Sequence, residues 1–146
     1  MCSSDLASAP VQSAVSAASA DPAAEQAAYR GAFELLKSGK YGKAALAFSE
    51  FISTYPSGRF TDNAQYWLGE SYYVTRKFDP ALKAFEQLVA SFPDSPKRGH
   101  ALLKIGFIFD ESGRKDEARK VLKELVAEDP GSTAAGLARK RLARLQ

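Results

Sequence analysis

The chain has 146 residues, is 45% hydrophobic and 25% charged, and carries a formal net charge of +3 at pH 7. These values are typical of one soluble globular domain with a short tail. No apolar run approaches the roughly 20 residues that cross a bilayer, so we expect no direct membrane insertion. We also expect no nucleic-acid partner, because the charge is small and the basic C-terminus has no interleaved aromatic residues to stack on bases.

The first 24 residues differ in composition from the rest. The opening "MCSSDL" resembles the translated end of a common sequencing adapter, so we expect residues 1–6 not to be native and the reading frame to be cut off upstream. Ala and Ser make up twelve of the eighteen residues from Ala7 to Ala24. Such a composition lacks the bulky apolar side chains that offset chain entropy, which predicts a disordered linker over residues 1–24. Asp21-Pro22 is typical of a helix N-cap followed by proline at the first helical position.

The rest of the chain repeats with a period of 37 residues. In each unit an alanine is followed four residues later by a large apolar residue, and eight residues after that by a proline. The recurring positions are Ala44, Ala81 and Ala118; Phe48, Phe85 and Leu122; and Pro56, Pro93 and Pro130. So many coincidences at one fixed period indicate a repeat protein.

Each unit is predicted to form two antiparallel helices, giving an all-α superhelix of three helix pairs with repeats at about 25–58, 62–95 and 99–132. The first helices are expected at about 23–38, 62–76 and 97–112, and the second helices at about 41–55, 80–92 and 115–129. Gly39 and Gly113 stand where a left-handed C-terminal cap is needed, and Asp79-Pro80 and Ser95-Pro96 are typical of N-cap-plus-proline starts. Residues 133–146 form an amphipathic pattern that predicts a capping helix, with its apolar side on the third unit. That side carries Ala134, Leu137, Ala138, Leu142 and Leu145.

The second unit resembles the tetratricopeptide repeat, whose signature is Trp-x2-Leu-Gly-x2-Tyr, then Ala-x3-Phe, then Pro. It supplies Leu68-Gly69-x2-Tyr72, Ala81-x3-Phe85 and Pro93. It departs from the signature at Gln65, where tryptophan is expected. The 37-residue period is also three residues longer than the usual one.

Three longer stretches narrow the resemblance. "TYPSGRFTDNAQYWLGESYY", "SFPDSPKRGHALLKIGFI" and "DPGSTAAGLARKRL" are similar to the C-terminal domain of the YbgF (CpoB) family of periplasmic Tol-Pal proteins, over about residues 25–146. The resemblance implies a periplasmic interaction module that binds TolA and a bifunctional peptidoglycan synthase, and that coordinates peptidoglycan synthesis with outer-membrane constriction during cell division. In that family an N-terminal coiled coil makes trimers. This sequence contains no coiled coil, so we expect a homotrimer only if that segment is present upstream.

The residue pattern predicts neither an enzyme nor a metal or cofactor site. His100 is the one histidine, and no cysteine or second histidine accompanies it. The sequence has no glycine-rich phosphate loop, zinc-ligand spacing or nucleophile elbow. Asp110-Glu111 and Glu128-Asp129 are adjacent acidic pairs, and neighbouring helical residues face different directions, which makes them poor acid–base partners.

The stretch "YWLGESYY", residues 66–73, carries the strongest indication of a binding surface. Helical spacing places Gln65, Leu68, Gly69 and Tyr72 on the packing side and Tyr66, Glu70 and Tyr73 on another face. In tetratricopeptide arrays that second face lines the concave side, which predicts a protein-binding groove with aromatic anchors. The predicted groove residues are Asn63, Tyr66, Trp67, Glu70 and Tyr73 in the second unit, His100, Lys104, Phe107 and Asp110 in the third, and Tyr29, Phe33 and Lys37 in the first.

Three alternatives remain at this point. The same aromatic residues could instead pack the seams between neighbouring first helices. The chain could be another envelope adaptor, such as an outer-membrane assembly lipoprotein, or the scaffold domain of an enzyme truncated upstream. A cationic clamp for a peptide's C-terminal carboxylate is not predicted, because only Lys37 and Lys104 are candidates for it.

Overall fold

The computed structural model describes residues 21–146, which form seven helices and no strand. The expected linker and adapter-like residues up to residue 20 lie outside the described residues. The predicted end of the linker at residue 24 is wrong, because Asp21 caps α2 and residues 22–24 form its first turn. The helices are α2 (Pro22–Lys37), α3 (Tyr41–Thr54), α4 (Thr61–Val74), α5 (Phe78–Ser91), α6 (Arg98–Glu111), α7 (Lys115–Glu128) and α8 (Thr133–Arg144). This is the predicted all-α superhelix of three helix pairs and a capping helix.

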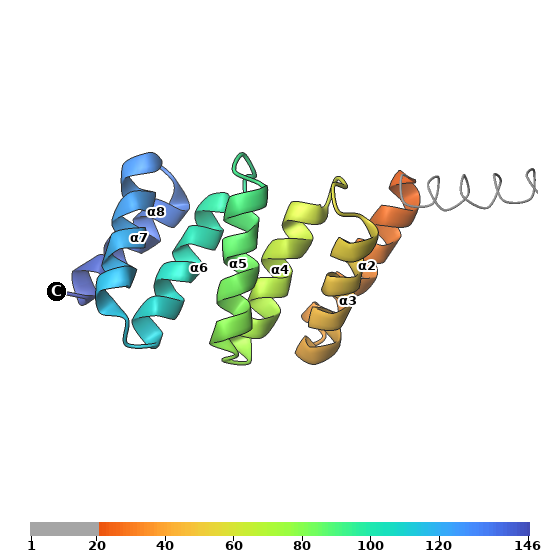
Figure 1. Cartoon of the computed structure of the whole chain (residues 1–146), viewed down its shortest axis with the longest axis horizontal. Helices are drawn as coiled ribbons and strands as arrows, with labels where there is room; N and C mark the ends of the chain where they lie inside the picture. Colours follow the sequence, from red (N-terminus) through yellow and green to blue (C-terminus); the bar gives the residue numbers. More distant parts are fainter. Residues whose placement is uncertain (1–20) are drawn as a thin grey trace, which may run out of the picture.

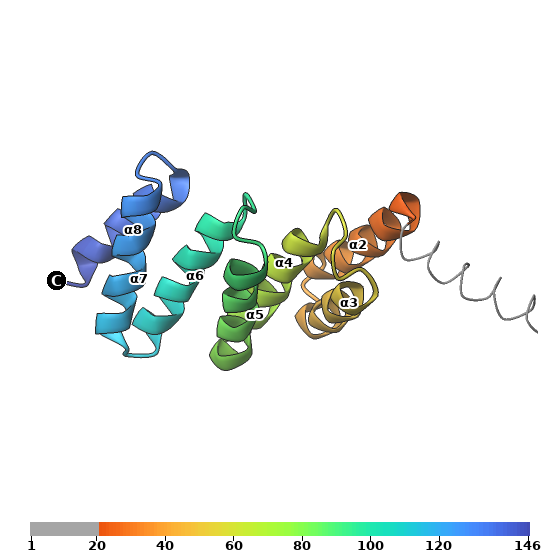
Figure 2. The same ribbon diagram turned by 45° about the horizontal axis from the view of Figure 1, so that its top comes forward.

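The helices stand side by side in a row that runs from α2 to α8 (Figures 1 and 2). Each helix packs against the next one in the chain, and α2 also contacts α4 while α6 contacts α8. Side chains of α4 and α6 also meet, at Glu70–Lys104 and Tyr73–Glu111, so the first helix of each pair lies beside the first helix of the next pair. We call the surface formed by α2, α4, α6 and α8 the first-helix face. None of the helices in the described part is long and apolar enough to cross a membrane.

The helix ends follow the sequence signals only in part. The Asp21 carboxylate accepts a hydrogen bond from the Ala23 N–H at 3.0 Å, and Pro22 opens α2, as predicted. Gly39 and Gly113 adopt φ of 77° and 80°, which confirms their role as left-handed caps. In the second unit the equivalent position is Arg76, which has φ of 59° although it carries a side chain.

The two other predicted proline starts are wrong. Helix α5 begins at Phe78, so Asp79 and Pro80 lie within its first turn, where a missing N–H costs nothing because the first N–H groups have no helical partner. Helix α6 begins at Arg98. The Ser95 hydroxyl instead accepts from the Lys97 N–H at 3.0 Å, which closes a turn before the helix.

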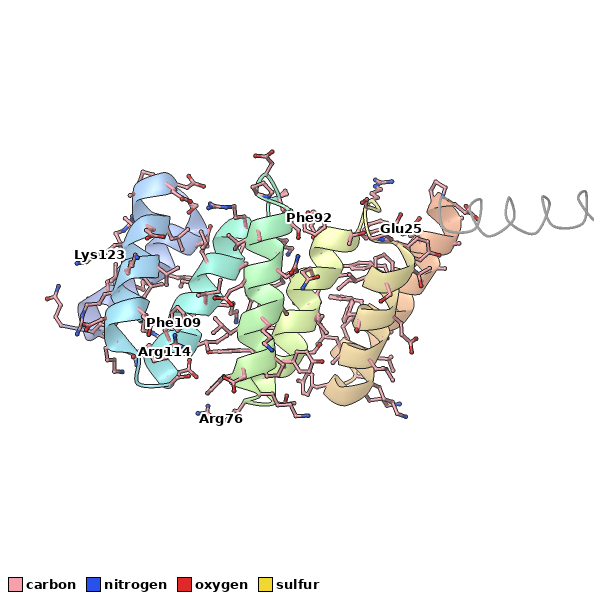
Figure 3. All side chains as sticks on the ribbon, in the orientation of Figure 1. Glu25, Arg76, Phe92, Phe109, Arg114 and Lys123 are labelled. Atoms are coloured by element: carbon pink, nitrogen blue, oxygen red, sulfur yellow. The ribbon has the colours of Figure 1, made fainter. Side chains whose placement is uncertain are left out.

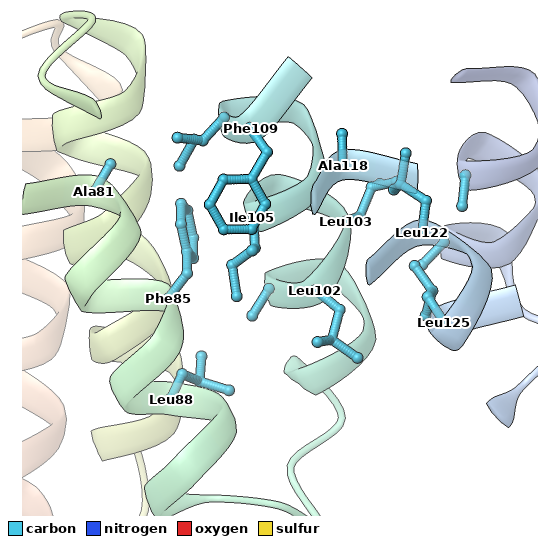
Figure 4. Close-up of a cluster of buried hydrophobic side chains, with 14 of the residues drawn as sticks. Ala81, Phe85, Leu88, Leu102, Leu103, Ile105, Phe109, Ala118, Leu122 and Leu125 are labelled. Atoms are coloured by element: carbon cyan, nitrogen blue, oxygen red, sulfur yellow. The ribbon is translucent and has the colours of Figure 1, made fainter. Parts of the chain in front are cut away.

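The core confirms the predicted role of the small residues in the second and third units. Phe48, Phe85 and Leu122 are all fully buried. Phe85 lies against Gly69 and Leu122 against Gly106, whereas the first unit has Ala32 at the equivalent position. A Cβ atom on Gly69 would lie 2.6 Å from the Phe85 ring, so the helix approach at that point requires glycine. Figure 4 shows Phe85 of α5 directed at Ile105 and Phe109 of α6, which carries one cluster across the boundary between units.

Helix α8 covers the third unit, as expected, with one difference. Ala134, Ala138 and Leu145 are buried, but Leu137 is 40% exposed. At about 100° per residue, Leu137 lies roughly a quarter turn from the centre of the buried side, which places it outside the packed stripe.

Candidate partner-binding surface

Five aromatic side chains form a continuous line across α2, α4 and the loop between α3 and α4. We call this set, Tyr29, Phe33, Phe60, Tyr66 and Trp67, the aromatic ladder. Phe60 stacks on Tyr29 with ring centroids 4.9 Å apart, and Tyr29 lies 6.2 Å from Phe33. Phe33 meets Trp67 edge to face at 5.2 Å, and Trp67 meets Tyr66 in the same way at 5.0 Å. Edge-to-face pairs at such distances are favourable beyond the area that they bury, so the ladder is a rigid apolar surface.

A buried carboxylate holds one end of the ladder in place. Glu25, in the first turn of α2, is 6% exposed and accepts a hydrogen bond from the Phe60 backbone N–H at 2.8 Å. Gly58 leaves room for that carboxylate, since a Cβ there would lie 2.2 Å from it. Figure 3 labels Glu25 at the end of the molecule where α2 begins. Glu25 thereby fixes the loop that presents Phe60 to Tyr29.

At each boundary between neighbouring first helices, two residues that are 34 positions apart in the sequence contact each other. Adding 37, the repeat length, to both residue numbers of one pair gives the pair at the next boundary. The three seam pairs are Phe33–Trp67 at 5.2 Å between ring centroids, Glu70–Lys104 at 3.1 Å between charged atoms, and Phe107–Arg141 at 3.9 Å from guanidinium to ring centroid. The first pair is uncharged, the second is an ion pair and the third is a cation–π contact.

The C-terminal half of the face is a connected set of charges, which we call the charged network. The Tyr73 hydroxyl donates to the Glu111 carboxylate at 2.5 Å, and the Lys104 ammonium lies 4.6 Å from the Tyr73 ring centroid. Arg141 of α8 donates to Asp110 at 2.9 Å and lies 3.8 Å from Glu111. These contacts tie α4, α6 and α8 together, and the cations and carboxylates within them are largely satisfied inside the chain.

Burial and neighbouring charges shift several pKa values in this region. Burial and the nearby Glu70 raise the pKa of Tyr66, and burial together with Glu111 raises that of Tyr73. Hydrogen bonds from Lys115, and after it Arg141, lower the pKa of Asp110. His100 has a lowered pKa because of burial and of the positive charges of Lys97 and Lys104. The tyrosines are therefore neutral donors at neutral pH, and Asp110 is a stable anion.

The structure brings ten of the twelve predicted groove residues into the aromatic ladder or the charged network, or into contact with one of them; Asn63 is half-buried and its N–H donates to Asp62. Tyr66 is buried at 7% exposure. The others that it brings together are half-buried: Tyr29, Phe33, Trp67, Glu70, Tyr73, His100, Lys104, Phe107 and Asp110. Lys37 is exposed and, among the residues that the structure describes, pairs only with Glu34 of its own helix, at 3.4 Å. The rings of Phe33, Tyr66 and Phe107 contact neighbouring helices, so seam packing describes part of what each of them does.

Sequence reasoning missed Phe60, Lys97 and Arg141. Phe60 and Lys97 each precede a helix, so an argument from helix faces could not place them. The 37-residue period could have indicated them. Phe60 and Lys97 occupy equivalent positions of the repeat, and Arg141 is equivalent to Lys104, which was among the predicted groove residues.

The chain belongs to the tetratricopeptide repeat family, whose model matches residues 29–96 and 66–133. A curated relative, the cell division coordinator CpoB of Pseudomonas putida, is 48% identical over 50 residues. That match is consistent with the YbgF (CpoB) resemblance, but it covers 34% of this chain and 19% of the relative, and it is shorter than the similarity expected over residues 25–146.

Solved structures agree with the fold. The Arabidopsis OM64 TPR domain has a TM-score of 0.69 at 17% identity, covering 83% of this chain and 95% of that one. The first TPR of Spaghetti (RPAP3), bound to an HSP90 peptide, has a TM-score of 0.71 at 17% identity, covering 86% and 93%. At these identities the likeness shows the tetratricopeptide architecture alone.

Proposed function

We propose that the chain is a non-catalytic, periplasmic protein-interaction module of the Tol-Pal system that coordinates peptidoglycan synthesis with outer-membrane constriction during cell division. Its partners in this proposal are TolA and a bifunctional peptidoglycan synthase. The similarity to CpoB supports the cellular role, and membership of the tetratricopeptide repeat family supports protein binding as its means.

The observation that carries the proposal is the half-buried Trp67 on the first-helix face. Its indole is held edge to face between Phe33 and Tyr66, so it has little freedom left to lose when a partner binds. Tryptophan in such a position is the residue type that most often dominates interface energy. The charged network beside it offers polar contacts at the rim, an arrangement typical of protein–protein interfaces.

Titration calorimetry of the chain against the purified periplasmic portion of TolA tests this function. We expect saturable binding that Trp67→Ala weakens about tenfold or more, which corresponds to roughly 1.4 kcal/mol. The matched control is Leu46→Ala, since Leu46 is 63% exposed and belongs to α3, which is not one of the helices that form the first-helix face. Tyr66 is less useful as a probe because it is buried, so its truncation would also remove core packing.

A circular dichroism melt of both variants verifies that they are folded. Absence of TolA binding by the folded chain would contradict the proposed function. Equal affinity of the wild type and Trp67→Ala would remove the first-helix face as the binding surface.

A further inference from the structure

Lys97 makes cation–π contacts with two rings of the aromatic ladder. Its ammonium nitrogen lies 5.0 Å from the centroid of the Tyr66 ring and 5.0 Å from that of Trp67. Within residues 21–146 it forms no ion pair, whereas Lys104 pairs with Glu70 and Arg141 pairs with Asp110. The half-buried residue Lys97 thus presents its ammonium beside Trp67, with no carboxylate of the described chain at ion-pair distance.

The carboxylates nearest the ladder are already engaged. Glu70 lies against Lys104 at 3.1 Å. Asp62 accepts hydrogen bonds from the Ser95 hydroxyl at 2.5 Å and from the Asn63 N–H at 2.9 Å. Burial is the main reason that the pKa of His100 is lowered, and the positive charges of Lys97 and Lys104 close by lower it further. Because Lys104 is paired with Glu70, Lys97 is the one of these two cations left to attract an incoming anion.

We propose that Lys97 receives a carboxylate from an acidic segment of a partner polypeptide, while a neighbouring aromatic or large aliphatic side chain of that segment packs on Trp67. The inference rests on the proposed function and adds to it the chemistry of the bound segment. A polypeptide carboxylate fits better than a phosphate group, because phosphate sites use several converging donors and Lys97 is a single ammonium. In the described part of the chain one other cation contacts the ladder without forming an ion pair: Arg59, which lies over a different ring, that of Phe60, at 5.5 Å from its centroid.

The two rings make Lys97 a better anion receptor than a free surface lysine. They restrict the ammonium to one place, so less side-chain entropy is lost when it pairs. They also shield it partly from water, which strengthens the attraction to a carboxylate relative to an exposed pair. The Lys97 position therefore combines charge, orientation and an adjacent apolar surface.

Selection of a phage-displayed random peptide library on the immobilised chain tests the inference. Peptides selected by the wild type should be enriched in Asp or Glu next to an aromatic or large aliphatic residue. On Lys97→Gln the acidic enrichment should disappear while the apolar preference remains. The matched control is Lys83→Gln, an exposed lysine of α5 without an ion pair, which should select the same peptides as the wild type.

A synthetic peptide of the selected consensus then gives the size of the effect. Replacing its Asp or Glu by the amide should weaken binding to the wild type about five- to tenfold and leave binding to Lys97→Gln unchanged. Lys97→Arg should keep the preference for the acidic form. Selection of uncharged or basic peptides, acidic selection that persists on Lys97→Gln, or no enrichment at all would overturn the inference. TolA titration in parallel separates the two claims, since TolA binding without acidic selection would leave the proposed function standing.

Discussion

The Lys104 ammonium lies 3.1 Å from the Glu70 carboxylate across the boundary between α4 and α6. One repeat earlier, the same two positions hold Phe33 and Trp67, which meet ring to ring. Equivalent positions of the repeat thus meet at both boundaries, while the chemistry of the contact changes from apolar to ionic. This allows one end of the first-helix face to present aromatic surface and the other to be closed by internal charge pairs.

A double-mutant cycle with Glu70→Gln and Lys104→Met should give a coupling free energy of about 1 kcal/mol, measured by urea unfolding. The pair is roughly four-fifths buried, with side chains 20% and 18% exposed, so water screens it less than a surface pair. The control cycle at Glu34 and Lys37, which are 60% and 57% exposed, should give about 0.3 kcal/mol or less. Equal coupling free energies in the two cycles would show that the position of Glu70 and Lys104 between two helices does not strengthen their ion pair.

Gly69→Ala should lower the free energy of unfolding by about 1–3 kcal/mol, because the added methyl would lie 2.6 Å from the fully buried Phe85 ring. Gly31→Ala provides the control within the same fold. Gly31 lies inside α2 with nothing within 4 Å of its added Cβ, so alanine there should stabilise by up to about 1 kcal/mol. Denaturant titrations of the two variants measure these changes in the free energy of unfolding, which should have opposite signs. Destabilisation of similar size at both positions would contradict the close-approach role of Gly69.

Arg76→Gly should raise the free energy of unfolding by about 0.5–1 kcal/mol. Arg76 has φ of 59°, and a residue with a Cβ pays a steric cost in that region that glycine does not. The contacts that would be lost are weak: an exposed ion pair to Glu111 at 3.8 Å and a cation–π contact to Phe78 at 4.9 Å. Thermal unfolding measures the change, with Gly39→Arg expected to destabilise by a similar amount. A lower melting temperature for Arg76→Gly would mean that the side-chain contacts outweigh the strain.

The stability of the chain should fall as pH decreases below about 6.5, in part because of His100. Burial, followed by Lys97 and Lys104, lowers its pKa from the ordinary 6.5, so the unfolded chain binds this proton at a higher pH than the folded chain does. The unfolded state then holds more protons between the two pKa values, and unfolding becomes easier as pH falls through that window. Urea unfolding from pH 7.5 to pH 5 should show a shallower decline for His100→Gln than for the wild type. An unchanged slope in the variant would contradict the shift.

The sequence predicted the helices well because small and large apolar residues recur at a strict 37-residue period. Ala44, Phe48 and Pro56 with their equivalents determine where the helices pack and where they stop, so architecture follows from spacing alone. The errors occurred at helix starts, where Asp79-Pro80 fits either an N-cap or a first turn. That choice depends on how the preceding turn closes, and in this chain it closes around Arg76.

The candidate site was less predictable, because a residue's helix face does not fix its exposure. Tyr66 and Trp67 are adjacent in the sequence, yet Tyr66 is buried against Phe85 and His100 while Trp67 remains half-buried beside Phe33. Lys97 reaches both of them from a loop one unit further on. Such contacts between units depend on the angle at which the units stack, and a one-dimensional pattern does not contain that angle.

The central claim, that the first-helix face is the partner-binding surface, is tested most directly by mapping the footprint of a partner. Isotope-labelled chain would be titrated with the unlabelled periplasmic portion of TolA, and backbone amide and Trp67 indole signals followed by NMR. We predict that the largest changes fall on Trp67, Lys97 and neighbouring residues of α2, α4 and α6, with α3, α5 and α7 little affected. Changes concentrated on those second helices, around the exposed Leu46 for example, would contradict the account.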